Sequence, residues 1–357
     1  MPKALKTAPL PPAGPDFAQR LVRWQREQGR HGLPWQGTAD PYRVWLSEIM
    51  LQQTQVVTVI GYYQRFLQRF PSVHELARAD VDEVMALWTG LGYYSRARNL
   101  HRCAQQVVHE WGGEFPVHSA DLVRLSGIGP STAAAIASIC QRERVAIFDG
   151  NVQRVLARHT AFEGDMAQLG QQRLLREVAL IRLPPSKDMP TYTQAIMDLG
   201  ATVCTPRQPG CGRCPVAQDC QALAQNRVAE LPRKTRKIRR DSQSWWLLMA
   251  QHPQKGVWLQ QRPAPGIWAG LYAFPVFSSL DDLRSVVPAR DQAGLVVHPA
   301  RLHVLTHRDL HLHLCVLSGR HDPGWPGPGG WFKPADYAAL GLPKPIRDWL
   351  RDVPGDA

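Results

Sequence analysis

Hydrophobic side chains between residues 17 and 226 recur at the spacing of amphipathic helices. One series with intervals of three, four and seven residues consists of Leu46, Ile49, Met50, Val56, Val57, Ile60 and Tyr63. Shorter helical runs cover residues 133–139 and 152–157, and glycine or proline breaks the pattern at residues 71, 90–92, 127–130 and 184–185. This period places one apolar stripe on each helix. We therefore predict an all-α first domain over residues 17–226.

Beyond residue 241 the pattern changes to short runs that are typical of β-strands. The runs cover residues 245–251, 256–262 and 310–317, and turns rich in proline and glycine separate them. Apolar runs bounded by such turns predict strands, so we expect a smaller α+β domain over residues 242–352. No apolar run reaches the roughly 18 residues that are needed to cross a bilayer. We therefore expect no membrane span.

Two further segments have their own composition. Residues 1–16 hold five prolines and no long apolar stretch, which predicts a flexible tail and not a secretory signal. The chain carries 42 Lys and Arg against 30 Asp and Glu, a net charge of +12. Seven basic residues against one acidic residue in 227–240 hold half of that excess, so we predict a basic linker over 227–241. Such an excess favours an anionic partner, of which nucleic acid is the leading candidate.

Four of the seven cysteines form the pattern C-x6-C-x2-C-x5-C at Cys204, Cys211, Cys214 and Cys220. The absence of a secretory signal predicts a reducing compartment, where clustered thiols more often hold metal than form disulfides. A compact loop of four cysteines suits a 4Fe-4S cluster, while zinc or no metal at all remain alternatives. The other three, Cys103, Cys140 and Cys315, have apolar neighbours and are predicted to be buried thiols.

Two stretches carry candidate chemistry in the helical domain. Gly-Ile-Gly-Pro at residues 127–130 precedes an alanine-rich helix, so its amides form either a phosphate-binding hairpin or a plain helix connection. Asp149 lies at the start of another helix, where it is either an N-cap or a functional carboxylate. Glu48 shares a helix face with Gln52 and Gln55. That face is either solvated or holds a partly buried carboxyl with a raised pKa, as a general acid requires.

The order of hairpin, loop and aspartate resembles the helix-hairpin-helix superfamily of DNA glycosylases. Several longer motifs resemble the adenine DNA glycosylases within it: LPWQ at 33–36, WLSEIMLQQTQ at 45–55, WTGLGYYSRAR at 88–98, DGN at 149–151, and the cysteine loop. Residues 245–275 are similar to the Nudix-like C-terminal domain of the same family. The resemblance implies a multidomain protein: an all-α helix-hairpin-helix glycosylase domain with a 4Fe-4S loop at 204–220, followed by a smaller α+β Nudix-like domain.

The same resemblance implies an enzyme that hydrolyses the N-glycosidic bond of adenine opposite 8-oxoguanine or guanine in duplex DNA. Glu48 would protonate the adenine and Asp149 would stabilise the sugar cation, after the base has been flipped out of the helix. Leu51 and Gln52 would fill the gap and Tyr93 would wedge beside the opposite base. The implied substrate and DNA contacts are Trp35, Leu51, Gln52, Tyr93, Gly127, Gly129, Ser131, Asn151, Gln194, Thr306 and His307.

Ser131 separates two related activities. In the endonuclease III branch the corresponding position is a lysine, whose amine attacks the sugar, and serine cannot form a Schiff base. We therefore expect a monofunctional enzyme that leaves an abasic site intact. The alternatives are a bifunctional glycosylase and lyase, which fails at Ser131, and a non-catalytic DNA-binding protein, which has no need of Glu48 and Asp149.

The second domain lacks the residues of a working Nudix hydrolase. No glutamate occurs from Leu231 to Ala357, so the magnesium site of that chemistry is absent. Leu305-Thr306-His307 resembles the lesion-reading Phe-Ser-His loop of the family, with leucine in place of the aromatic residue. The histidines at 303, 307, 311 and 313 are expected to share a solvent face and not a metal. We expect a monomer that is cytoplasmic, and nucleoid-associated in a bacterium.

Overall fold

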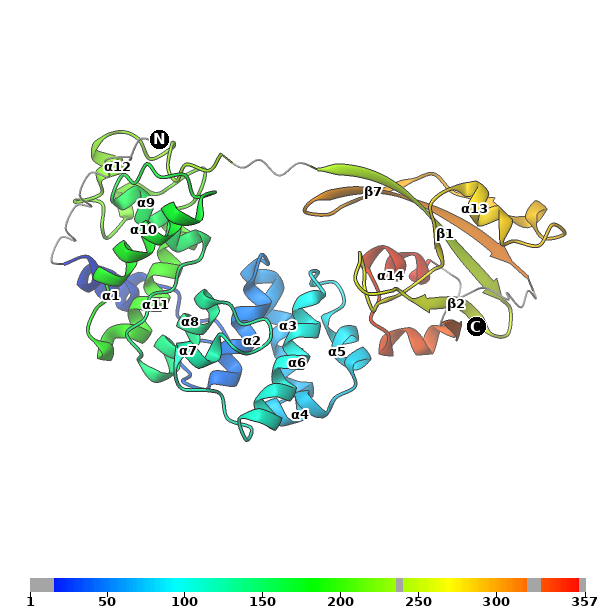
Figure 1. The fold of residues 1–357 in the computed structure, drawn as a ribbon, viewed down its shortest axis with the longest axis horizontal. Coiled ribbons are helices and arrows are strands. Elements are labelled where there is room, and N and C mark those ends of the chain that lie inside the picture. The colour runs from blue at the N-terminus through cyan, green and yellow to red at the C-terminus, as the bar shows by residue number, and fades with distance from the viewer. Residues whose placement is uncertain (1–15, 236–239, 320–328, 353–357) are drawn as a thin grey trace, which may run out of the picture. The chain divides into compact units, whose positions relative to one another are not determined.

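The computed structural model describes residues 16–235, 240–319 and 329–352. Residues 1–15 of the predicted tail and 236–239 of the predicted linker lie outside the described residues. The described chain forms two compact units, one from residues 16–77 and 102–235 and the other from 78–101 and 240–352. Figure 1 labels the helices of both units and the strands β1, β2 and β7.

The first unit is helical, as its apolar periodicity predicts. Its helices are α1 (Phe17–Gln28), α2 (Pro41–Leu51), α3 (Val56–Arg69), α7 (Ser119–Leu122), α8 (Pro130–Gln141), α9 (Gly150–His159), α10 (Leu169–Ile181), α11 (Met189–Asp198) and α12 (Gln221–Ala224). Helices α4 (Val73–Arg78) and α6 (Ser95–Glu110) cross the boundaries between the units. Side chains cap several of these helices, because Asp40 accepts a hydrogen bond from the Tyr42 amide and Asp149 from the Val152 amide.

Helix α8 lies at the centre of this unit and brings the candidate site together. Ala133, Ala135 and Ala137 on α8 are at most 1% exposed, and the helix packs against both α2 and α11. Alanine side chains are small, so neighbouring helices can approach α8 closely. As a result, Glu48 on α2, Asp149 before α9 and Gln194 on α11 belong to neighbouring elements of one packed core.

Helix α11 continues directly into a π-helical turn, Leu199–Val203, that ends at Cys204. The Cys204 amide donates to the Leu199 carbonyl at 2.7 Å, which is the i to i+5 bond of a π-helix. A Cβ atom on Gly200 would lie 2.6 Å from Cβ of Asn151, so only glycine fits at this crossing with α9. The turn therefore joins the middle of the helical core to the cysteine loop.

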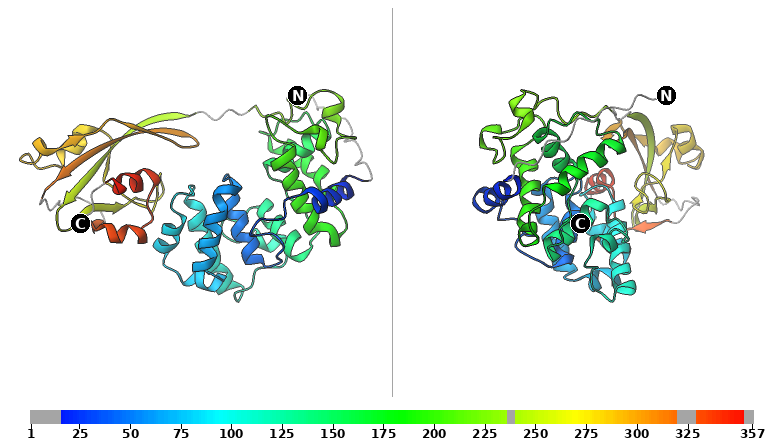
Figure 2. Two further views of the ribbon diagram at one scale, coloured as in Figure 1. Left: turned by 180° about the vertical axis from the view of Figure 1, so that it is seen from behind. Right: turned by 60° about the vertical axis from the view of Figure 1, so that its left-hand side comes forward.

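The second unit is built on one mixed sheet. Its strands are β1 (Asp241–His252), β2 (Gly256–Gln261), β3 (Tyr272–Ala273), β4 (Val276–Phe277), β5 (Val296–Val297), β6 (Arg301–Val304), β7 (Arg308–Ser318) and β8 (Gly329–Phe332). The order is β3-β2-β1-β7-β5, with β4 on β1, β6 on β7 and β8 on β2. The long strands β1 and β7 lie side by side in the sheet (Figure 2). They run parallel, with Asp241 opposite Arg308 and Gln251 opposite Ser318. These two strands form the centre of the sheet.

Helices cover this sheet in the second unit. Leu283 of α13 (Leu280–Ser285) packs with Leu248 of β1 and Cys315 of β7. Helix α14 (Lys344–Arg351) buries Ile346, Trp349 and Leu350. Residues 78–101, with helix α5 (Val81–Trp88), belong to the same unit. Tyr93 is thereby a neighbour of the sheet domain, which its position in the sequence did not indicate.

The first half of the predicted linker is bound to the helical unit. The Met166 amide donates a hydrogen bond to the Arg233 carbonyl oxygen at 2.9 Å, and the Thr235 amide donates one to the Asp165 carboxylate at 3.0 Å. Arg227 forms an ion pair with Glu163 at 2.6 Å. Strand β1 begins at Asp241, the last residue of the predicted linker. In the ranges that the structure describes, no helix combines the length and hydrophobicity of a membrane span.

Candidate active site

A cavity of about 600 Å³ opens in the helical unit between α2, the loop before it, the end of α8, and α11. Four of the predicted site residues line it: Trp35, Glu48, Leu51 and Gln194. Trp35 is 7% exposed and its ring packs edge-on against Tyr63 at 5.4 Å. A volume of this size is typical of pockets for small organic ligands. The cavity is therefore large enough to admit a planar heterocycle.

Glu48 is the acid of this pocket. Burial, and to a lesser extent the nearby Asp149 carboxylate, raise the pKa of its carboxyl from the ordinary 4.5 to about 7. A carboxyl with this pKa holds its proton for about half of the time at neutral pH. It can therefore donate a proton to a bound base and accept one afterwards.

Asp149 is both an N-cap and a neighbour of Glu48. Its Oδ1 accepts the Val152 amide at 2.8 Å and its Oδ2 accepts the Asn151 side-chain amide at 3.4 Å. The start of α9 adds the positive end of a helix dipole to these two donors, and this end favours a negative charge. The two interpretations of Asp149 are thus compatible, since the contacts that cap the helix also hold the carboxylate in place.

A chain of hydrogen bonds leads from Asp149 to the cysteine loop. Asn151 donates to Asp149, and Arg154 Nη2 donates to Asn151 Oδ1 at 2.8 Å. Arg154 also donates to the carbonyl oxygens of Gly200 and Cys204, each at 2.7 Å. One guanidinium therefore connects the start of α9 with the π-turn and with the first cysteine of the loop.

The glycine-rich hairpin adopts the backbone that its sequence predicts. Gly127 has a positive φ of 78°, and Gly129 precedes the first residue of α8. Ser131 follows, and its hydroxyl oxygen accepts the Phe148 amide at 3.0 Å. Since Phe148 directly precedes Asp149, this bond fixes the segment that carries the aspartate. The sequence assigned Ser131 a DNA contact and did not suggest this bond.

The four clustered cysteines line a single small cavity together with Arg158. Arg158 Nη1 lies 3.4 Å from Sγ of Cys204, and the same guanidinium donates to the carbonyl oxygens of Thr205 and Pro206. Burial raises the pKa of the Cys214 thiol to about 11, and the neighbouring cysteines contribute in the same direction. Within the described ranges no three His, Cys, Asp or Glu side chains are arranged to hold a metal ion. The four thiols thus lie around one cavity, but they do not form a closed set of metal ligands.

One cysteine differs from its prediction. Cys140 was expected to be a buried thiol like Cys103 and Cys315, but it is partly exposed and lines the base-sized pocket. It lies in the last turn of α8, whose apolar neighbours in sequence concealed the pocket side of the helix.

The remaining predicted contacts lie in the second unit. The Tyr93 hydroxyl and the Thr306 hydroxyl are 2.9 Å apart, and both residues are exposed. Together with Trp268, His303 and His307 they line a second cavity of about 770 Å³. His303 is half-buried against the Trp268 ring at 5.7 Å, and His313 stacks on Trp246 at 4.0 Å. Ring contacts therefore account for two of the four histidines that were expected to share a solvent face.

Comparisons with known proteins identify the family. Residues 46–179 match the HhH-GPD superfamily of base excision DNA repair proteins, and residues 245–352 match the NUDIX domain. The adenine DNA glycosylase of Buchnera aphidicola subsp. Schizaphis graminum is 32% identical over 94% of this chain and 97% of that protein. The adenine DNA glycosylase of Buchnera aphidicola subsp. Baizongia pistaciae is 36% identical over 92% and 94%. The chain belongs to the adenine DNA glycosylase family.

Membership confirms the predicted family, the enzyme class and the fold class. A thermostable thymine-DNA glycosylase has a similar fold, with a TM-score of 0.53 and 26% identity over 58% of this chain and 95% of that one. The chain is a DNA glycosylase of base excision repair, a hydrolase of N-glycosyl bonds.

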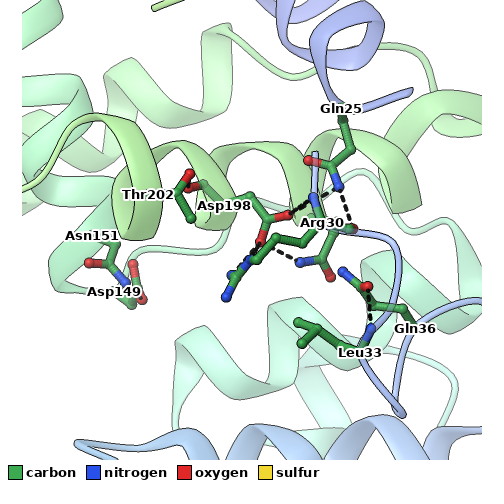
Figure 3. A network of polar contacts seen from close by, with 9 residues as sticks. Gln25, Arg30, Leu33, Gln36, Asp149, Asn151, Asp198 and Thr202 are labelled. Atoms are coloured by element: carbon green, nitrogen blue, oxygen red, sulfur yellow. Dashed lines mark hydrogen bonds and ion pairs between the residues drawn. The ribbon is translucent and has the colours of Figure 1, made fainter. Parts of the chain in front are cut away.

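Sequence reasoning missed one buried carboxylate, whose partners Gln25, Arg30 and Gln194 line the pocket. Asp198, at the end of α11, is 0% exposed. Its Oδ1 accepts Arg30 Nε at 3.0 Å and Gln194 Nε2 at 2.8 Å, while its Oδ2 accepts Gln25 Nε2 and the Arg30 amide, each at 3.1 Å. Figure 3 shows Asp198 with Gln25 and Arg30, which bind it. A lone aspartate between Met197 and Leu199 was the available signal, because a charge inside an apolar helix needs partners.

Proposed function

We propose that this enzyme removes adenine from mispairs with 8-oxoguanine or guanine in duplex DNA and leaves the abasic strand uncut. The observation that carries the proposal is a pair of unlike, neighbouring carboxyl groups: Glu48 lines the pocket, and Asp149 lies close enough to raise its pKa. Glu48 has a pKa of about 7, while Asp149 accepts two hydrogen bonds at a helix N-terminus. This division resembles the acid and the charge-stabilising carboxylate of glycoside hydrolysis.

The reaction follows from these two groups. The adenine enters the pocket between Trp35 and Leu51, and Glu48 transfers its proton to a ring nitrogen of the base. The bond between the sugar carbon and N9 then breaks, and its electron pair leaves with the neutral adenine. Positive charge develops on the sugar and is stabilised by Asp149. The Glu48 carboxylate accepts a proton from water as the water oxygen bonds to the sugar, which completes hydrolysis.

Two observations support a monofunctional reaction. Position 131 in the hairpin is a serine, whose hydroxyl cannot form the imine that strand cleavage requires. Its oxygen is already engaged by the Phe148 amide at 3.0 Å. We infer that the product is an intact abasic strand and free adenine.

We infer that the second unit reads the base opposite the adenine. Thr306 and His307 lie exposed on the turn between β6 and β7, and Tyr93 contacts that turn through Thr306. Hydroxyl and imidazole groups can form hydrogen bonds with the edge of a purine. The lack of glutamate after Leu231 supports recognition as the role of this domain in place of Nudix hydrolysis.

We propose a 4Fe-4S cluster as the cofactor of the cysteine loop. The donor set fits this group, because four thiols and no other candidate ligand line one cavity, and the Arg158 guanidinium lies beside Cys204. Thiolate ligands are what iron-sulfur clusters require, while zinc is the alternative that elemental analysis distinguishes. We assign the cluster a structural role, in which it closes the loop that follows α11. The proposed partner is duplex DNA, bound by a monomer.

A single-turnover assay tests the proposed function. Duplexes with adenine opposite 8-oxoguanine, guanine or thymine are incubated with excess enzyme, and alkali then reveals abasic sites. We expect excision from the first two duplexes and intact strands without alkali. Absence of excision from both would refute the proposal, and strand breaks before alkali, with a complex trapped by borohydride, would refute the monofunctional reaction. Glu48→Gln provides the inactive control.

A further inference from the structure

The turn of residues 305–307 between β6 and β7 is held by the residues that begin β1. The turn closes on itself through the Leu305 amide, which donates to the Arg308 carbonyl at 2.8 Å. The Asp241 amide then donates to the His307 carbonyl at 3.3 Å, and Arg240 Nη2 donates to the Leu305 carbonyl at 2.9 Å. The start of β1 therefore grips the backbone at both ends of the turn. We refer to residues 305–307 as the reading turn.

Two crossed ion pairs reinforce this grip. Arg240 pairs with Asp309 at 2.6 Å. The next residue, Asp241, pairs with Arg308 through both oxygens, at 2.9 Å from Nε and 2.7 Å from Nη2. The charges alternate in both segments, with Arg240 and Asp241 at the start of β1 and Arg308 and Asp309 at the start of β7. A shift of one residue in one direction would place Arg240 opposite Arg308 and Asp241 opposite Asp309, so the ion pairs favour the observed register over that one.

The other side of the reading turn is held by Tyr93. Its hydroxyl lies 2.9 Å from that of Thr306, and its own backbone has a positive φ of 50°, which is rare for a residue with a side chain. Such backbone strain persists only where the surroundings hold it. Arg96 does so here, since its Nη2 donates to the Gly92 carbonyl at 3.1 Å. The reading turn is thus fixed from two sides, while the His307 side chain stays exposed.

The ion pairs are poorly placed to stabilise the fold. The side chains of Asp241 and Arg308 are 57% and 39% exposed, and exposed pairs of this kind contribute little to the free energy of folding. Their geometric effect is larger, because the same residues bind the turn carbonyls directly. Displacing a recognition group by about 1 Å is enough to weaken its contribution by as much as 10²-fold.

We propose that Arg240, Asp241, Arg308 and Asp309 are positioning residues that set the preference of the enzyme for the base opposite adenine. The inference rests on the proposed function, in which the reading turn contacts that base. The crossed pairs keep Thr306 and His307 at a fixed distance from Tyr93. The hydrogen-bonding groups of the reading turn then fit the edge of one purine, 8-oxoguanine or guanine, better than the edge of the other. Residues at the end of the basic linker thereby determine specificity without touching the DNA base.

Charge reversal across one pair tests this inference. Asp241→Arg and Arg308→Asp each place like charges together, and the double variant D241R/R308D restores the pair in the opposite sense. The measured quantity is the ratio of single-turnover excision efficiencies for adenine opposite 8-oxoguanine and opposite guanine. We expect each single variant to reduce this preference about ten-fold, as the loss of one good hydrogen bond does. The double variant should recover most of it.

A matched control separates geometry from bulk charge. Arg290→Asp changes the net charge by the same amount as Arg308→Asp, and the Arg290 side chain is 84% exposed. Arg290 lies between α13 and β5. Strand β5 pairs with Cys315 and Val316 of β7, and not with the part of β7 that pairs with β6 next to the reading turn. The Arg290→Asp variant should retain the parental preference. Hydrogen exchange of the Leu305 amide provides a second readout in the free protein, faster in both single variants and slow again in the double variant.

The outcomes discriminate between the ideas. An unchanged preference in both single variants, a loss that the double variant does not restore, or an equal loss in Arg290→Asp overturns the positioning role. A parent that excises adenine equally from both duplexes overturns it as well. If the parent excises adenine from neither duplex, the proposed function fails, and the amide exchange then still reports whether the pairs hold the turn.

Discussion

Replacing Glu48 by glutamine should abolish excision and at the same time stabilise the protein, by an amount that depends on pH. In the unfolded chain the carboxyl loses its proton near pH 4.5, whereas in the folded protein its pKa is about 7. Between these values the folded state binds a proton that the unfolded state has released. The stability of the parent therefore falls as the pH rises from about 4.5 to 7, and the full cost is present above pH 7.

The magnitude follows from the two pKa values. A pKa of about 7 in place of 4.5 corresponds to roughly 3 kcal/mol, since a tenfold change in proton affinity is 1.36 kcal/mol. Glutamine carries no charge at any pH, so Glu48→Gln should be more stable than the parent by up to about 3 kcal/mol at pH 8. For a domain of this size that difference raises Tm by on the order of 5–10 °C. At pH 4.5 or below the two proteins should have nearly the same Tm.

Two assays test the prediction together. Thermal unfolding of the parent and of Glu48→Gln is followed at pH 5 and pH 8, with Glu27→Gln on the exposed side of α1 as a control that should show no pH-dependent gain. Single-turnover excision by Glu48→Gln should fall by 10² to 10⁴-fold or more, with binding to the mispaired duplex retained. An equal stabilisation at both pH values would show that the raised pKa is not its cause. Excision at the parental rate would show that Glu48 is not the acid.

Three further changes test other parts of the structure. Asp198→Asn removes the charge that Arg30 and Gln194 bind. Urea unfolding should show a loss of stability on the order of 3 kcal/mol. Excision should also weaken, as measured by the enzyme concentration at half-maximal rate. Ser131→Ala leaves the Phe148 amide without its acceptor, and should cost about 1–3 kcal/mol and slow excision without creating a complex that borohydride can trap. Neutralising Arg233, Lys234, Arg236 and Lys237 should lower the slope of log binding constant against log salt concentration, by an amount that corresponds to roughly two to three counterions. The number is below four because Arg233 already forms ion pairs with Glu163 and Glu230. An unchanged slope would exclude the linker as a phosphate contact.

The sequence could predict those features that depend on local pattern. Helical periodicity predicted the helical character of the first unit, because most helices bury one stripe whose spacing is visible in the chain. It did not predict the break between α2 and α3 at residues 52–55, or the exposure of Val57. Asp149 could be identified because an N-cap leaves its mark within three residues, and the structure shows this bond to Val152. Glu48 could be singled out because a carboxyl among Ile49, Met50 and Leu51 is unusual in a helix. In each case the informative neighbours are close in sequence.

Features that depend on distant neighbours could not be predicted. The donors to Asp198 come from residues 25, 30 and 194, and no local pattern links them. Residues 227–235 have the composition of a solvated linker, yet Asp165 and Glu163 hold them on the helical unit. The placement of residues 78–101 with the sheet domain likewise depends on packing between segments that are far apart in the chain. The composition of a segment indicates its local conformation and solvation, whereas its contacts with distant residues determine where it lies in the fold.

The π-helical turn Leu199–Val203 has a consequence for how this region can change in evolution. It contains one residue more per turn than an α-helix would, and it lies between Asp198 at the pocket and Cys204 at the loop. Deleting one residue here would rotate everything after it by about 100° relative to α11. Cys204 would then turn away from the other three cysteines, or Asp198 from Arg30. Substitutions that keep Gly200 can therefore be tolerated along this segment, but insertions and deletions cannot, and its length should be far more constant than its composition.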